Sequence, residues 1–269
     1  MTAVLAERHT QSASPYRLSF SRLLHSEWIK LATLRSTWWS VGITGVLTIG
    51  IAVLIAQSVN TPGFPGIQAA VSPIQFTMLL AGILGAIAVT GEYSTGMIRS
   101  TLTAAPRRGA VLAAKAIIVG AFMFVVAAVI FLAAALVVTP TLAAKDLGIA
   151  WGDPEGALMP ILAASFSMSV FALIGVAFGF LIRSGAGAIA ATVGLLFVLP
   201  IVVSIFSFDD GAWQWIRDIG NYLPMSASQS LILPRDDWGL SASTALLALC
   251  GWVVAGMLGA WTALRTRDA

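Results

Sequence analysis

Six long stretches of almost purely apolar residues alternate with polar segments along the chain. Such a stretch must be helical in hydrocarbon, because unpaired backbone amides cost several kcal/mol each in lipid. The pattern therefore predicts an all-α integral membrane protein with six transmembrane helices. Their expected ranges are 38–56, 73–90, 116–138, 159–182, 185–206 and 241–264.

A helical periodicity of another kind precedes the first span, at residues 16–36. Wound as an α-helix, this segment separates an apolar side from a polar side. The apolar side holds Phe20, Leu23, Leu24, Trp28, Leu31 and Leu34, and the polar side holds Arg22, Ser26, Lys30 and Thr33. This predicts an amphipathic helix in the membrane interface. It follows a mobile cytoplasmic tail, residues 1–15, and precedes a transmembrane domain, residues 37–269.

Glu27 interrupts the apolar side of this amphipathic helix. One interpretation is an ion pair with Lys30, three residues further on, which stabilises a helix by a few tenths of a kcal/mol. The other is a contact with a cytoplasmic partner. The sequence leaves both open.

The basic residues set the expected orientation of the spans. One side of the membrane receives Arg8, Arg17, Arg22, Lys30, Arg35, Arg99, Arg107, Arg108, Lys115, Arg183, Arg265 and Arg267, and the other side receives Lys145, Arg217 and Arg235. Because cytoplasmic loops are rich in Lys and Arg, we expect both termini in the cytoplasm.

The longest external loop is then 207–240, which is rich in Asp and Trp. Its aromatic residues predict either an anchor on the outer membrane surface or an extracellular gate. A short helix is expected in it before Pro224.

Composition agrees with a membrane protein. Of 269 residues, 58% are hydrophobic and 10% are charged, against roughly 25% charged residues in soluble domains. The net charge is only +3, and no run of basic residues forms a surface for nucleic acid. The lipid bilayer is therefore an expected partner and nucleic acid is not.

The residues that common catalytic sites need do not cluster in the spans. His9 and His25 both precede the first span, and no cluster has metal-ligand spacing. No lysine follows glycine in a phosphate-binding loop. We therefore expect no enzyme activity, metal or cofactor in this chain, so that energy for any movement would arrive through its cytoplasmic surface.

The segment 91–115, between the second and third spans, is the candidate site at which an external energy source would act on this chain. It contains one acid, Glu92, and the bases Arg99, Arg107, Arg108 and Lys115. A short helix is predicted at 95–103, and Pro106 blocks its extension because the residue before proline avoids helical angles. Such a helix can transmit a movement to the second and third spans, which adjoin it. The alternative is an ordinary basic loop set by the positive-inside bias.

This segment resembles the cytoplasmic loop of ABC-2 type transporter permeases, the membrane subunits of a class of ATP-driven exporters. The resemblance depends on Glu92-Tyr93, Gly96, Thr101-Leu102, Pro106-Arg107-Arg108 and Lys115. Residues 23–39 are similar to the interface helix of actinobacterial members, and the order of six spans covers essentially the whole chain. Met97 stands where the family commonly has Thr.

The resemblance implies a permease subunit in a bacterial plasma membrane that exports a hydrophobic or amphipathic substrate, such as a drug, peptide or lipid. A separate cytoplasmic ABC ATPase, in two copies, would bind ATP and Mg²⁺. A second permease copy or a paralogue would complete the transporter.

The family's coupling helix corresponds to Glu92, Tyr93, Gly96, Arg99, Pro106, Arg107 and Arg108, and its interface helix to Glu27, Trp28 and Lys30. By this resemblance, Glu92 would hold the loop against basic groups, and Arg99 and Arg107 would meet acids on the ATPase.

Other functions stay open on the sequence alone. A permease-like unit can serve signalling or resistance without bulk transport, and a membrane anchor can recruit other proteins. A lipid-processing enzyme would need a polar cluster within the spans, which the sequence does not display.

Overall fold

The computed structural model describes residues 19–105, 107–205, 214–234 and 239–266. These residues form helices joined by turns and short loops, and six of the helical segments are long and apolar enough to cross a membrane. They are α2 (Arg35–Ser58), α3–α4 (Gly66–Val71 and Ile74–Ser94), α6 (Arg108–Ala143), α7 (Leu158–Ile182), α8–α9 (Gly185–Val193 and Leu199–Ile205, joined by the π-helical turn η1, Gly194–Val198) and α12 (Ala242–Thr266). The predicted all-α class is confirmed for the described residues, and the six long apolar helices fit the predicted multi-pass membrane protein.

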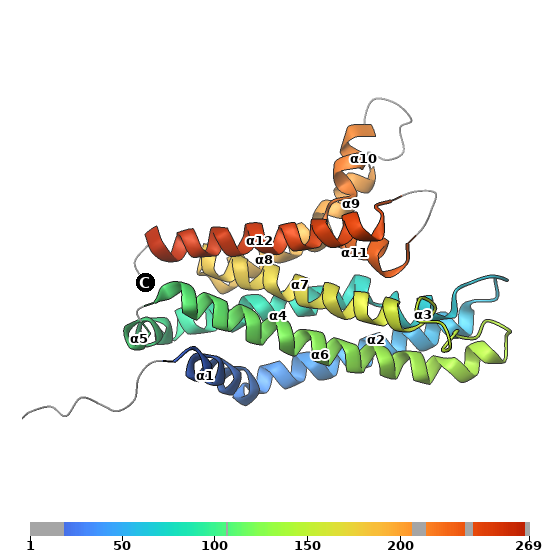
Figure 1. Cartoon of the computed structure of the whole chain (residues 1–269), viewed down its shortest axis with the longest axis horizontal. Coiled ribbons are helices and arrows are strands. Elements are labelled where there is room, and N and C mark those ends of the chain that lie inside the picture. The colour runs from blue at the N-terminus through green and yellow to red at the C-terminus, as the bar shows by residue number, and fades with distance from the viewer. Residues whose placement is uncertain (1–18, 106, 206–213, 235–238, 267–269) are drawn as a thin grey trace, which may run out of the picture.

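Four further helices lie outside these spans in the described ranges. They are α1 (Phe20–Thr33), α5 (Met97–Ala104), α10 (Gln214–Gly220) and α11 (Pro224–Ile232). Figure 1 shows the long helices running side by side, with α1 and α5 at one end of the bundle and α3 at the other. The bundle thus has two distinct ends, separated by the length of its spans.

Helix α7 is the centre of the bundle and packs against α4, α6, α8, α11 and α12. Its contact with α4 is close because glycines face each other. A Cβ atom at Gly85 would collide with the backbone carbonyl of Ala172, and one at Gly175 with the carbonyl of Gly82. Close approach through small residues is typical of helices that pack within a membrane.

The outer helices turn apolar side chains away from the protein. Leu54 on α2 and Leu247, Val254 and Leu258 on α12 are all more than half exposed. A surface of this kind suits lipid tails or another apolar helix and would be costly in water.

The polar segment 91–115 is more helical than the sequence predicted. Helix α4 continues to Ser94 and α6 already begins at Arg108, so α5 stands between two short breaks. The predicted short helix is present as α5. The span boundaries differ because a helix keeps its backbone hydrogen bonds beyond the apolar run that predicted it.

Two helices were not predicted. Helix α3 lies in the expected loop 57–72, and its apolar side chains Ile67 and Val71 are buried. Helix α11 begins with Pro224 at its first position, where a missing N–H costs nothing. The short helix expected before Pro224 is present as α10. The predicted tail 1–15 lies outside the described residues.

Candidate functional site: a buried ion network beside helix α5

Helix α5 is held at a fixed angle to α4 by a two-residue turn. Thr95 Oγ1 donates to the carbonyl of Gly91 over 2.8 Å and closes the end of α4. Gly96 follows with a φ of 71°, a left-handed conformation that suits glycine. The buried side chain of Ile98 then fixes α5 against the protein.

Beside this turn, four charged side chains from three helices form a closed ion network. Glu27 and Lys30 come from α1, Glu92 from the last turns of α4, and Lys115 from the second turn of α6. Lys115 Nζ lies 2.5 Å from Glu27 Oε2 and 2.7 Å from Glu92 Oε1. Lys30 Nζ lies 2.7 Å from Glu27 Oε1 and 3.0 Å from Glu92 Oε1. Each ammonium thus bridges both carboxylates.

The ion network is deeply buried and electrically neutral. The side chains of Glu27, Glu92 and Lys115 are 3–4% exposed, and only Lys30 reaches solvent, at 22%. A charge removed from water costs several kcal/mol, which close pairing and further hydrogen bonds offset. Removing one member would leave a buried charge without its counter-ion. The ion network therefore holds α1 against α4 and α6.

Lys30 lies on α1, outside the membrane-spanning segments. Burial lowers its pKa, but the hydrogen bond and charge of Glu27, together with those of Glu92, outweigh that effect and raise the pKa above its usual value. Lys30 is therefore a cation throughout the physiological pH range.

Thr101 connects α5 to the ion network. Lys30 Nζ donates to Thr101 Oγ1 over 3.3 Å, and Thr101 Oγ1 donates to Glu92 Oε2 over 3.5 Å. A displacement of α5 would thus act on α1 and α4 through one hydroxyl group.

Tyr93, which follows Glu92 in α4, takes part in a second group of contacts. The Tyr93 ring packs edge-on against Phe180 of α7, with ring centroids 6.4 Å apart, and the Arg183 guanidinium lies 5.3 Å from the Tyr93 ring centroid. Consecutive residues of α4 therefore contact opposite parts of the bundle, α1 and α6 through Glu92 and α7 through Tyr93.

Two arginines extend this second group to the end of α12. Arg183 Nη2 donates to the carbonyl of Ala263 over 3.0 Å, and Arg108 Nη1 donates to the carbonyl of Leu264. The last carbonyls of a helix have no partner within it and carry the negative end of its dipole, so cations stabilise them. The ends of α4, α6, α7 and α12 are thereby joined beside α5.

The residues predicted for the coupling and interface helices fall into two groups. Glu27, Lys30, Glu92, Tyr93 and Arg108 make the internal contacts described above, whereas Arg99 and Arg107 are exposed. The Glu27–Lys30 pair expected from their spacing is present.

The remaining predicted residues are not part of these contacts. Trp28 is partly exposed and packs edge-on against Phe122 of α6, with centroids 6.1 Å apart. Gly96 forms the turn before α5. Pro106 lies outside the described residues.

Lys115, Thr101 and Arg183 were not among the predicted site residues. Lys115 had a signal in the sequence, because it is a lone cation beside an apolar run and needs a counter-ion if the helix starts before it. The contacts of Arg183 with α4 and α12 depend on how the spans pack, which residue spacing does not give.

Comparison of the chain with models of known protein families and with curated proteins finds no match.

Proposed function

We propose that this chain is the permease subunit of an ABC-2 type transporter, driven by ATP hydrolysis in a separate cytoplasmic ATPase. Its cargo is a hydrophobic or amphipathic molecule that leaves the cell. The ATP and Mg²⁺ sites belong to the ATPase, two copies of which serve two permeases. The end of the bundle that carries α1 and α5 faces the cytoplasm in a bacterial plasma membrane.

The observation that carries this proposal is the attachment of α5. It is a short helix at one end of the bundle, with Arg99 exposed on it and Arg107 exposed just after it. On its inner side, Thr101 joins the buried ion network of Glu27, Lys30, Glu92 and Lys115. A helix that offers cations outward and is tied inward to several spans suits a docking element.

Movement of α5 would be transmitted to other helices through the end of α4. The ion network would transmit the movement to α1 and α6. Tyr93 would transmit it to α7 and, through Arg183, to α12. Closure of the ATPase pair would bias the spans between two packing arrangements. The protein needs no internal energy source for this cycle.

The proposal is tested by purifying the tagged chain in mild detergent and identifying the proteins that accompany it. We expect a stoichiometric ABC ATPase. The double variant Arg99→Glu/Arg107→Glu should lose it, because reversed charges repel acids on the docking surface.

The matched control is Arg217→Glu, since Arg217 is also exposed but lies on α10. It should retain the ATPase. A folded wild-type chain that purifies without any ATPase would contradict the proposal and favour a membrane anchor.

A further inference from the structure

A cavity of about 390 Å³ lies at the end of the bundle opposite α5. Its walls come from α3, the first turn of α4, the end of α9, and α11, and Gly239 also contacts it. Helix α4 has 21 residues and a rise of about 1.5 Å per residue, so the cavity and α5 stand roughly 30 Å apart. Its volume lies within the range of small-molecule sites, about 300–1,000 Å³.

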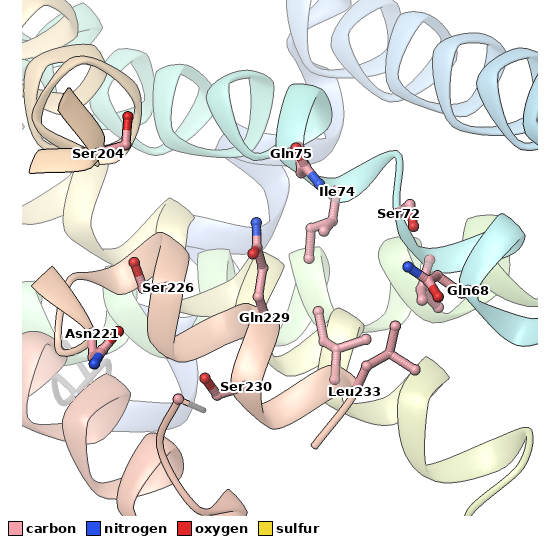
Figure 2. Close-up of a pocket in the computed structure, with 13 residues that line it drawn as sticks. Gln68, Ser72, Ile74, Gln75, Ser204, Asn221, Ser226, Gln229, Ser230 and Leu233 are labelled. Atoms are coloured by element: carbon pink, nitrogen blue, oxygen red, sulfur yellow. The ribbon is translucent and has the colours of Figure 1, made fainter. Parts of the chain in front are cut away.

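The polar side chains of this cavity are amides and hydroxyls. Gln75 of α4 and Gln229 of α11 reach toward the same space from opposite walls (Figure 2), and Ser226 and Asn221 also line the cavity. Among the described residues that line the cavity, none is charged or aromatic. This part of the lining therefore offers neutral hydrogen bonds.

The amides lining the cavity do not satisfy one another. Within the described part of the chain, the side chains of Gln68, Gln75, Asn221 and Gln229 make no hydrogen bond to protein. Gln75 and Gln229 are exposed, so their amide groups are accessible to a ligand or to water in the cavity. Each amide supplies donors and an acceptor, which match hydroxyl or amide groups of a ligand or the water that a ligand displaces.

One part of the cavity is apolar. Val71, Ile74, Ile232 and Leu233 line it alongside the amides. An amphipathic molecule would contact both kinds of wall at once, with its head group at the amides and its chain at the aliphatic residues.

We propose that this cavity binds the uncharged, hydrogen-bonding head group of an amphipathic molecule. Gln75 and Gln229 contact the head group from two sides, and Ile74 and Leu233 contact the start of its apolar chain. The assignment of this ligand as transported cargo rests on the proposed function, whereas the binding itself does not.

The test uses the full chain in lipid nanodiscs, without ATPase or ATP, so a negative result concerns the cavity alone. The single cysteine is removed by Cys250→Ser, and Ser226→Cys then reports on the cavity through its rate of reaction with a water-soluble maleimide. Ser58→Cys, exposed at the end of α2 and outside the cavity lining, is the matched control.

Four probes with the same eight-carbon chain are added below their micelle-forming concentrations. Octyl glucoside offers neutral hydroxyls and octanoyl-glycinamide a neutral amide, whereas octyl sulfate and octyl-trimethylammonium are charged. We expect at least one neutral probe to slow labelling at Ser226→Cys saturably, about threefold at a concentration of about twice its Kd. The neutral probe that protects better identifies hydroxyl or amide chemistry.

Labelling at Ser58→Cys should not change, and Gln75→Leu/Gln229→Leu should weaken the protection at Ser226→Cys. Equal protection by all four probes, or none by either neutral probe, would overturn the proposal. A Ser226→Cys thiol that never reacts with the maleimide would overturn it as well, because the cavity would then be closed.

Discussion

Glu27 shows what a single residue contributes to this protein. Helical periodicity put it on the apolar side of α1 and suggested Lys30 as its partner, and that pair is present. Its second partner, Lys115, is 88 residues away in the chain. No local pattern connects those two positions, so the sequence could supply half of the ion network and only packing could supply the rest.

The first prediction concerns the balance of charge in the ion network. Lys115→Met leaves two carboxylates with one ammonium and should lower the free energy of unfolding by about 3–5 kcal/mol. Adding Glu92→Gln restores neutrality, so the double variant should lose less than the sum of the two single losses. Reversible unfolding in mixed micelles gives these free energies, and Arg99→Met is the exposed control. Additive losses would show that the two groups do not interact.

The second prediction concerns Thr101, through which α5 contacts the ion network. Thr101→Val keeps the size of the side chain but removes both hydrogen bonds. If α5 drives the spans, the ATPase should still assemble with this variant, whereas transport per ATP hydrolysed should fall several-fold. Thr101→Ser should restore transport. Equal transport by the valine and serine variants would exclude this hydroxyl from coupling.

At the scale of elements, the spans were predictable because their apolar runs are long. The packing of α4 on α7 was not predicted, because it depends on which helices meet in the folded bundle. Helices α3 and α11 were not predicted because both are short, with six and nine residues. Their apolar side chains become buried only when other helices cover them.

Close packing of α4 on α7 gives the third prediction. Gly85→Ala places a methyl group against the Ala172 carbonyl and should cost about 1–3 kcal/mol of stability by overpacking. Gly50→Ala is the control, since a Cβ at that position on α2 meets nothing within 4 Å. Thermal unfolding in detergent should separate the two variants. Similar melting temperatures would mean that the two helices separate readily.

At the scale of the whole molecule, the described structure has one end with charged contacts and another with a cavity whose described lining is polar and apolar but uncharged. The charged end joins α1, α4, α6, α7 and α12 beside α5. The cavity lies between α3, α4, α9 and α11. Helices α4 and α7 run between the two ends, so a change of packing at one end can reach the other.

The fourth prediction is the orientation of these two ends. In the Cys250→Ser background, Glu155→Cys should react with a membrane-impermeant maleimide in intact cells. Ser184→Cys, in the turn between α7 and α8, should react only after the membrane is opened. Both native side chains are exposed, so accessibility to water is matched. The reverse pattern would place α5 outside the cell, where no ATPase could reach it.

The most direct test of the central claim is photo-crosslinking from α5 in living cells. A photoreactive amino acid replaces Arg99, and the same amino acid at Arg217 serves as the control. We predict that Arg99, and not Arg217, crosslinks to a cytoplasmic polypeptide with an ABC ATPase sequence. Crosslinks from Arg99 to lipid or to this chain alone, with the protein folded in the membrane, would contradict the claim that α5 receives its movement from an ATPase.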